Sequence, residues 1–382
     1  MAYIYLDYMA STPIDSRVLD VMLPYMQDPM WCANPSSTQN CLGQKAMKAV
    51  EMSRESIAST VGAKSEEIFF TSGATEANNL ALFGAARFYQ RQGKHLITVA
   101  TEHKSVLQVF EELEKQGFSV TYLMPQSNGL LALSDLQGAI RPDTILVSVM
   151  HVNNEIGVIQ DIQAIGECLK SKGILFHVDA AQSFGRLPID LSSLPVDLMS
   201  FSGHKVYGPK GIGALFIRKK PRVNLSPITF GGAQEQGLRP GTLATHQIVG
   251  MAQAYRLAVL DEKAEQQRIL LLREHMRQEI DTIGGVHWHG DWQQRIAGNL
   301  NLSFADVDGS ELISALFPLV ISSQSACSAS QGSSSHVLAA LGVPIALARA
   351  CLRISLGRFT KSSEIEQSCD IIKKTIPLLR KK

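Results

Sequence analysis

Short apolar segments alternate with helical patterns through the first two thirds of the chain. Each apolar segment has the length of a buried strand, and several stretches between them have apolar residues spaced for one helix face. The expected strands include His95–Ala100, Val120–Met124, Thr144–Met150, Ile174–Val178, Leu198–Phe201 and Gly213–Ile217. This alternation predicts an α/β fold, in which a mainly parallel sheet has helices on both faces.

Polar residues follow several of these strands. They are His103, Asn153–Asn154, Asp179–Gln182 and Ser202–Lys205. The carboxyl ends of parallel strands lie at the same edge of a sheet, and open α/β sheets bind ligands at that edge. We therefore expect these side chains to converge on one crevice.

The segment Leu198–Leu215 reads L-M-S-F-S-G-H-K-V-Y-G-P-K-G-I-G-A-L and carries Lys205 directly after a buried strand. An amine held on rigid backbone, partly desolvated and next to His204, is expected to have a lowered pKa and to form a Schiff base with a carbonyl compound. Lys205 is therefore a candidate anchor for an aldehyde cofactor. A lysine that only ends a strand and reaches solvent would give the same pattern.

Asp179, in H-V-D-A-A-Q, is expected at the carboxyl end of the preceding strand. A carboxylate there can pair with the protonated ring nitrogen of pyridoxal phosphate and keep the ring electron-withdrawing. A buried aspartate that only caps a helix is the alternative. The presence of Lys205 on the next strand favours the cofactor interpretation.

The segment Glu67–Leu82 turns from a strand into a helix through Ser72-Gly73-Ala74-Thr75. This geometry leaves free backbone N–H groups beside hydroxyls, which can hold a phosphate, although a plain N-cap would look the same. His103 could lie on a cofactor ring and exchange protons, or simply start a helix. Asn154 could bind a ring substituent or a substrate carboxylate, or form a turn before Gly157.

Cys327 lies in a segment of small polar residues, S-S-Q-S-A-C-S-A-S-Q-G-S-S-S, at 322–335. On an exposed loop it could attack a bound substrate as a thiolate, whereas a chance cysteine in a serine-rich linker is the alternative. Cys168 and Cys369 are expected on a helix face or in the core. His287 and His289 are expected at the surface, because no third ligand with metal-site spacing accompanies them.

The 382 residues are expected to form two domains. A long charged helix over Gly250–Ile283 would bridge them. The large domain is expected to comprise residues 14–255. Residues 1–13 and 256–382 are expected to form a small α+β domain that carries the 322–335 loop. The basic end from Lys373 onward is expected to be a solvated tail.

A formal net charge of +1 gives no electrostatic reason to expect nucleic acid or an anionic membrane as a partner. The amino-terminal residues do not resemble a signal peptide, and no apolar run is long enough to span a bilayer. The expected location is cytoplasmic.

The chain resembles the cysteine desulfurases of the NifS and IscS type in segments that occur in the same order over nearly its whole length. These segments are D-Y-M-A-S-T-P, T-S-G-A-T-E-A-N-N, T-E-H-K-S-V, H-V-N-N-E-I-G, H-V-D-A-A-Q, S-G-H-K-V-Y-G-P-K-G-I-G, R-P-G-T, S-A-C-S-A-S and R-I-S-L-G-R-F-T. The resemblance implies pyridoxal 5'-phosphate as cofactor. It also implies the fold-type I, aspartate-aminotransferase-like architecture, with a mainly parallel seven-stranded sheet and a smaller α+β domain.

The resemblance also implies a role for each matching residue. Lys205 would be the Schiff-base lysine and Cys327 the persulfide-forming cysteine. His103 would stack on the cofactor ring, Asp179 would pair with the ring nitrogen, and Gln182 would form a hydrogen bond to the phenolic oxygen. Asn154 and Arg353 would contact the substrate carboxylate. The phosphate would be bound by Ala74, Thr75, Ser202 and His204 and, from the neighbouring subunit of a homodimer, by Thr242.

The activity implied is the conversion of L-cysteine to L-alanine, with the sulfur passing to Cys327. From there it would go to an acceptor protein, either an iron–sulfur scaffold or a tRNA-thiolation protein. Two alternatives stay open. One is a selenocysteine lyase or another pyridoxal-phosphate enzyme of the aminotransferase class in which Cys327 is incidental, and the other is a non-catalytic protein that keeps the fold.

Overall fold

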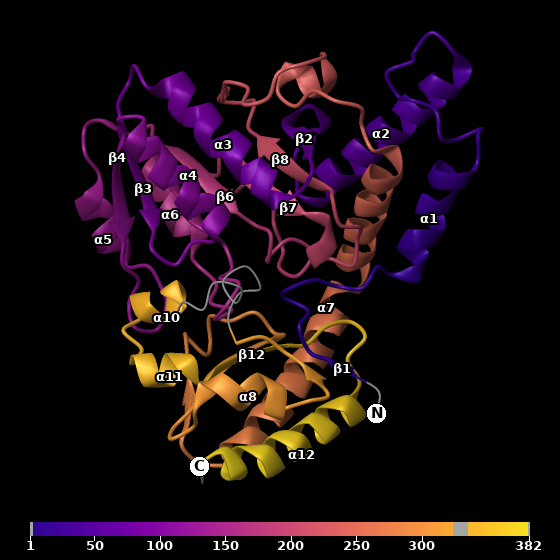
Figure 1. Ribbon diagram of the computed structural model, residues 1–382. Coiled ribbons are helices and arrows are strands. Elements are labelled where there is room, and N and C mark those ends of the chain that lie inside the picture. The colour runs from indigo at the N-terminus through magenta and orange to yellow at the C-terminus, as the bar shows by residue number, and fades with distance from the viewer. Residues whose placement is uncertain (1–2, 324–334, 381–382) are drawn as a thin grey trace.

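The computed structural model describes residues 3–323 and 335–380, so Cys327 lies outside the described residues. Figure 1 shows a larger upper part and a smaller lower part, joined by the long helix α7 (Thr245–Asp281). None of the helices in the described ranges is long and apolar enough to cross a membrane.

A seven-stranded sheet forms the centre of the larger part, with strand order β2-β8-β7-β6-β5-β3-β4. β8 pairs antiparallel with both of its neighbours, and the other pairs are parallel. The strands are β2 (Ile68–Thr71), β3 (His95–Val99), β4 (Ser119–Leu123), β5 (Thr144–Ser148), β6 (Leu175–Asp179), β7 (Leu198–Ser202) and β8 (Gly213–Ile217). The α/β fold with a mainly parallel sheet, expected from the strand–helix alternation, is confirmed.

Successive strand residues point to opposite faces of this sheet, and each face has its own core. On β5, Leu146 belongs to one hydrophobic cluster and Val147 to the other. The cluster of Leu146 includes α3 (Ala74–Tyr89) and α4 (Lys104–Lys115). The cluster of Val147 includes buried residues of α1 (Ser16–Gln27), α2 (Cys41–Thr60), α5 (Leu133–Ala139), α6 (Ile162–Lys170) and the first part of α7. Helices therefore cover both faces, as expected.

The smaller part has a three-stranded antiparallel sheet with β10 (Asn299–Phe304) between β12 (Cys351–Ser355) and β9 (Val286–Trp288). A separate parallel pair joins β1 (Ile4–Tyr5) to β11 (Leu319–Val320). Other elements of the chain are η1 (Ser65–Glu67), η2 (Gly203–Lys205), η3 (Gln234–Gly237), α8 (Gly309–Ala315), α10 (His336–Ala340), α11 (Ile345–Arg349) and α12 (Ser362–Leu379). The β1–β11 pair brings the start of the chain beside the smaller sheet, which a local sequence pattern does not reveal.

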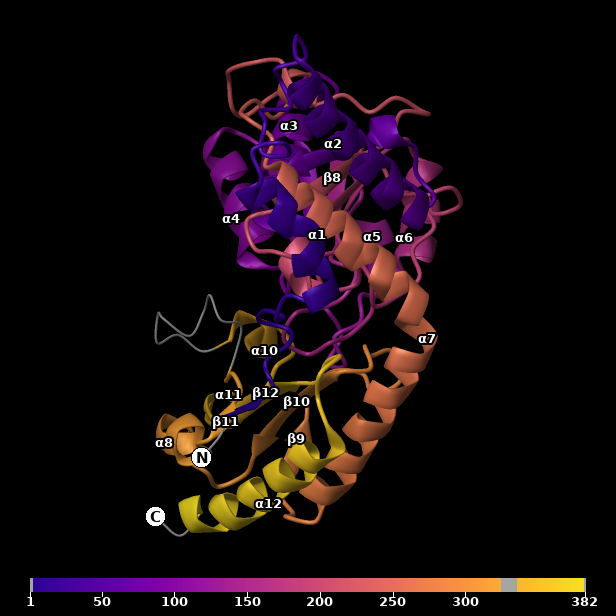
Figure 2. The ribbon, with the colours of Figure 1, turned by 90° about the vertical axis from the view of Figure 1, so that its right-hand side faces the viewer.

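α7 belongs to both parts of the molecule. Its early residues, such as Ile248 and Tyr255, pack in the core of the large sheet, whereas Leu272 and Met276 pack in the core of the smaller part. Figure 2 shows this helix running along one side of the molecule from the upper part to the lower part. The predicted boundary at 255/256 falls inside this continuous helix, and the two-domain division stays a prediction.

Two expectations for the smaller part were wrong. The described part of the basic end is not a solvated tail, because Lys373 lies in α12, whose Ile372 and Ile376 are fully buried. His289 is not at the surface: it is 6% exposed and its Nε2 lies 2.7 Å from the Ser303 hydroxyl. Burial lowers the pKa of His289 to about 4. In both cases tertiary packing buries residues that local sequence patterns did not mark as core.

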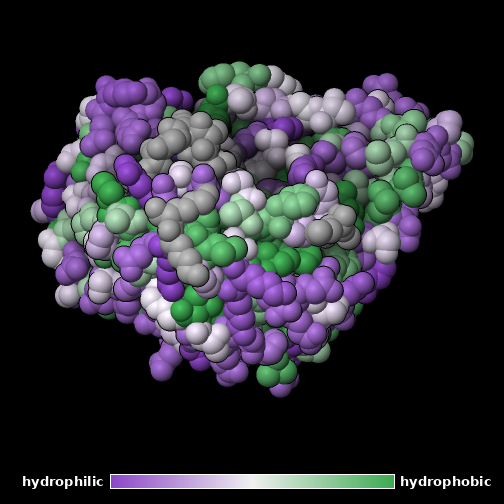
Figure 3. All heavy atoms as spheres, turned by 60° about the horizontal axis from the view of Figure 1, so that its bottom comes forward, coloured by the Kyte–Doolittle hydropathy of each residue, from purple (hydrophilic) through white to green (hydrophobic). Residues whose placement is uncertain are grey.

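Figure 3 views the lower face of the molecule, where hydrophilic residues are interspersed with smaller hydrophobic groups. Within residues 3–323 and 335–380, no group of three or more His, Cys, Asp or Glu side chains could hold a metal ion. Cys369 is buried on α12, and Cys168 is half-buried on α6.

Candidate active site

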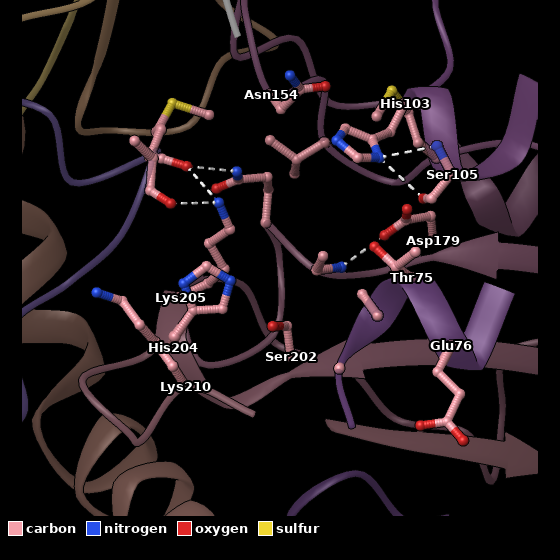
Figure 4. Close-up of a pocket in the computed structure, with 18 of the residues that line it drawn as sticks. Thr75, Glu76, His103, Ser105, Asn154, Asp179, Ser202, His204, Lys205 and Lys210 are labelled. Atoms are coloured by element: carbon pink, nitrogen blue, oxygen red, sulfur yellow. Dashed lines mark hydrogen bonds between the residues drawn. The ribbon is translucent and has the colours of Figure 1, made fainter. Parts of the chain in front are cut away.

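A cavity of about 330 Å³ lies where the carboxyl ends of the parallel strands face the smaller part. Figure 4 shows side chains from several separate elements pointing into it. The residues expected from the sequence that line it are Ala74, Thr75, His103, Asn154, Asp179, Gln182, Ser202, His204, Lys205 and Arg353. The expected convergence on one crevice is therefore confirmed. Thr242 does not line this cavity in the single chain.

Lys205 ends η2, directly after β7. Its Nζ donates hydrogen bonds to the backbone carbonyl of Met9 at 2.7 Å and to that of Ala10 at 2.8 Å, which Figure 4 shows as dashed lines. The amine therefore does not extend into bulk solvent. It reaches across the cavity to the amino-terminal segment, which forms the opposite wall.

Asp179 is the last residue of β6 and is 5% exposed. Its Oδ1 accepts from the backbone N–H of Ala181 at 2.9 Å, and its Oδ2 accepts from Asn78 Nδ2 at 2.8 Å. Residues after Asp179 form a turn rather than a helix, so this carboxylate is not a helix cap. The same carboxylate lines the cavity.

His103 is the N-cap of α4 and also lines the cavity, so its position at a helix start does not exclude a role in the site. Its Nδ1 accepts from the Ser105 backbone N–H at 3.1 Å and lies 2.8 Å from the Ser105 hydroxyl. Burial lowers the pKa of His103, the charge of Asp179 opposes that shift, and the charge of Lys205 adds to it. The ring is therefore expected to be neutral near pH 7.

The amino terminus of α3 opens on the cavity through Ala74 and Thr75. Its N-cap is Gly73, which has a φ of +151° and makes no side-chain cap. The backbone N–H of Ser72 donates to Glu76 at 2.5 Å. Uncapped N–H groups and the helix dipole make such an end favourable for an anion.

Three further side chains line the same cavity: Ser202, His204 and Lys210. The Nδ1 of His204 lies 3.2 Å from the Ser11 hydroxyl. Burial, with the charges of Lys205 and Lys210, lowers the pKa of His204 to about 4. His204 therefore contributes a neutral ring to the cavity, and Lys210 contributes a basic side chain to its lining.

Arg353, from β12, brings a guanidinium into the cavity and is 1% exposed. Its Nη1 donates to the backbone carbonyl of Asn154 at 2.9 Å, and its Nη2 donates to Asp7 at 2.8 Å. Its Nε is buried and has no hydrogen-bond partner among the residues that the structure describes. A buried donor without a partner is costly, and a carboxylate bound here would satisfy it.

Gln182 lines the cavity, but both ends of its amide already contact the chain. Its Nε2 donates to the Met9 carbonyl at 2.9 Å, and its Oε1 accepts from Arg186 at 3.0 Å. One Nε2 hydrogen is left for another acceptor.

Several residues of the site were not predicted as site residues. Met9 and Ala10 contribute backbone carbonyls, Asp7 contributes a carboxylate, and Asn78 and Ser105 support Asp179 and His103. The amino-terminal segment is far from Lys205 in the sequence, and the fold brings the two together.

The comparisons with known proteins agree with this geometry. The sequence profile of the family described as aminotransferase class-V matches residues 4–367. A cysteine desulfurase IscS of Pectobacterium atrosepticum is 53% identical over 377 residues, which cover 99% of this chain and 93% of that protein. A solved NifS-like protein has a TM-score of 0.92 at 34% identity, with 99% of this chain and 100% of that chain covered. The structure described as SspA in complex with cysteine has a TM-score of 0.83 at 40% identity, with 94% and 99% covered.

The profile spans most of the chain, and the identity to the Pectobacterium protein extends over nearly its whole length. This result confirms the resemblance found in the sequence. The chain therefore belongs to the class-V aminotransferase family and, within it, to the cysteine desulfurases of the NifS and IscS type.

Proposed function

We propose that this chain converts L-cysteine to L-alanine and retains the sulfur as a persulfide on Cys327, with pyridoxal phosphate held in the cavity between the two parts. The observation that supports this most strongly is that one cavity is lined by an amine, a carboxylate and a guanidinium: Lys205, Asp179 and Arg353. These are the groups needed to bind an aldehyde, a protonated ring nitrogen and a substrate carboxylate.

The shape and donors of the cavity fit this cofactor. The uncapped end of α3, with Thr75, Ser202 and Lys210, suits the phosphate. If an L side chain replaced Gly73, its Cβ would meet no atom of the described residues within 4 Å, so they leave space beside this helix end. Asp179 is held by two donors and would accept a hydrogen bond from the ring nitrogen.

Pyridoxal phosphate, when bound, supplies an electron sink that stabilises negative charge at the α-carbon of an amino acid. Side chains of the protein would orient the substrate, accept its proton and attack its sulfur. Arg353 would orient the substrate carboxylate, His103 would lie against the ring, and Lys205 would take the α-proton on Nζ. The Cys327 thiolate would then attack the substrate sulfur, so that an S–S bond forms as the C–S bond breaks.

The proposed assembly is a homodimer, in which Thr242 of each chain contributes to the phosphate site of the other. Thr242 follows Gly241 in an exposed loop, where a second chain could reach it. The sulfur would leave Cys327 for an acceptor protein of the iron–sulfur scaffold or tRNA-thiolation type. The proposed location of the enzyme is the cytoplasm.

The test is to locate the cofactor on the chain. Borohydride reduction of the purified protein, followed by peptide mass spectrometry, should place the pyridoxyl group on Lys205. The Lys205→Ala variant should carry no label and form no alanine from L-cysteine, whereas the control Lys115→Ala, at an exposed position on α4, should behave as the unchanged protein. A label on another lysine would overturn the assignment.

A further inference from the structure

The amide of Asn78 links two residues of the cavity. Asn78 lies on α3 with no exposed surface, and its Nδ2 donates to Asp179 Oδ2 at 2.8 Å and to the Ser105 hydroxyl at 2.9 Å. An ionised carboxylate can only accept, so the nitrogen of the amide, not its oxygen, must face Asp179. This orientation is kept although Asn78 Oδ1 is buried without a hydrogen-bond partner in the described ranges. Asp179 therefore fixes the direction in which the amide points.

The Ser105 hydroxyl connects the Asn78 amide to His103. It accepts a hydrogen from Asn78 and lies 2.8 Å from Nδ1 of His103. A hydroxyl has a single hydrogen, and of the two hydrogen-bond neighbours that the described ranges give it, Nδ1 is the one that can accept. The Ser105 backbone N–H donates to the same nitrogen at 3.1 Å.

Two donors therefore converge on Nδ1 of His103, which must present a lone pair to them. In a neutral imidazole the proton then resides on Nε2. Figure 4 shows Ser105 on one side of the ring and the other ring nitrogen pointing away from it. We propose that Asn78 and Ser105 form a directional hydrogen-bond relay from Asp179 that holds His103 as its Nε2–H tautomer.

The relay has a consequence that depends on the proposed function. A ring with a proton on Nε2 meets a bound ligand as a proton donor, so Lys205 is left as the first base. Asn78 and Ser105 are positioning residues, because they act through His103 and Asp179. The charged or titratable groups that also influence His103 are Asp179, Lys205, His336 and Glu155.

The relay also opposes a positive charge on His103. Protonation at Nδ1 would break the bond from the backbone N–H and require the Ser105 hydroxyl to turn its hydrogen away from the ring, and the side of the oxygen that faces Asn78 is already occupied by the donated amide hydrogen. Removal of Asn78 opens that side to the hydroxyl hydrogen, so that the oxygen can accept from a protonated ring. His103 should then take up its second proton at higher pH.

The experiment is a nitrogen–proton correlation spectrum of the full-length, cofactor-loaded protein labelled with ¹⁵N-histidine. The His103 signals are assigned by their loss in His103→Gln. Near pH 7 the unchanged protein should show the Nε2–H tautomer, and a proton on Nδ1 would overturn the proposal. The spectrum needs no turnover, so this failure would leave the proposed function intact.

Variants then test the relay itself. In Asn78→Ala and in Ser105→Ala, His103 should titrate at higher pH than in the unchanged protein. Asn79→Ala is the matched control, because Asn79 lies one position along the same helix and bonds to the Thr75 carbonyl instead. Ser105→Thr should keep the titration of the unchanged protein, since it keeps the hydroxyl. If His103 titrates as before in folded Ser105→Ala, no relay exists, whether or not Asn78→Ala folds.

Discussion

The buried Arg353 and the half-buried Asp7 form an ion pair, with Nη2 2.8 Å from Oδ1, that joins the guanidinium of the cavity to the amino-terminal segment. The other oxygen of Asp7 accepts from the Ser322 hydroxyl at 2.7 Å. The backbone of Ser322 in turn pairs with that of Arg353. Asp7 therefore balances the charge of Arg353 and also holds the start of the 322–335 segment.

The loss of the negative charge of Asp7 should lower the stability of the folded protein. Asp7→Asn keeps the shape but leaves a buried positive charge without its counterion, and we expect the free energy of unfolding to fall by about 3 kcal/mol. Asp143→Asn is the control, because Asp143 pairs with Arg141 at the surface, where loss of the pair should cost about 1 kcal/mol or less. Urea unfolding measures both. Equal effects of the two substitutions would show that Asp7 carries no special charge-balancing role.

His177 should make the protein sensitive to acid. It is fully buried between the hydroxyls of Ser148 and Ser200, and burial lowers its pKa to about 3. The unfolded chain binds the proton more readily than the folded one. The free energy of unfolding therefore has its full value, as far as His177 is concerned, above about pH 6.5. It decreases progressively as the pH falls toward about 3.

The measurement is urea unfolding at about pH 7 and about pH 5. The glutamine of His177→Gln does not titrate. Between these two pH values the free energy of unfolding of this variant should therefore fall by about 2 kcal/mol less than that of the unchanged protein. His287→Gln, at an exposed position, is the control. An identical pH dependence in His177→Gln and the unchanged protein would mean that His177 does not resist protonation.

The sequence predicted the parts of this molecule that local patterns determine. Apolar strands that end in polar residues placed His103, Asp179 and Lys205 together, because the carboxyl ends of parallel strands share one sheet edge. The family resemblance added Arg353, which no local pattern singled out. The predicted position of Cys327 stays untested, since it lies outside the described residues.

The parts that were missed depend on contacts between distant segments. Asp7 meets Arg353 through a separation of 346 residues, and Ser105 meets Asn78 from a neighbouring helix. His289 was expected at the surface because no third metal ligand accompanies it, and the end from Lys373 onward because it is basic, but the small core buries His289, Ile372 and Ile376. Periodicity and turn signals report local structure and carry no information on such pairings.

Thr242 offers a test of the proposed dimer. Thr242→Ala alone should retain the cofactor weakly, and Lys205→Ala alone should be inactive. If Thr242 acts in the partner's site, a mixed dimer of the two variants has one complete site. Random re-association of equal amounts should then restore activity in about one quarter of the sites. Measurement of alanine formation after mixing checks this, and a mixture no more active than its components would exclude a contribution across the dimer.

The central claim is that Cys327 takes the sulfur of L-cysteine. The most direct measurement is peptide mass spectrometry of the protein after incubation with L-cysteine, together with an alanine assay of the solution. We predict one extra sulfur atom on the Cys327 peptide and alanine in solution. Cys327→Ala should show neither the extra sulfur nor continued alanine formation. Cys32→Ala, in which the exposed Cys32 is replaced, should show both. Extra sulfur on a different cysteine, or alanine formed at the full rate by Cys327→Ala, would contradict the account.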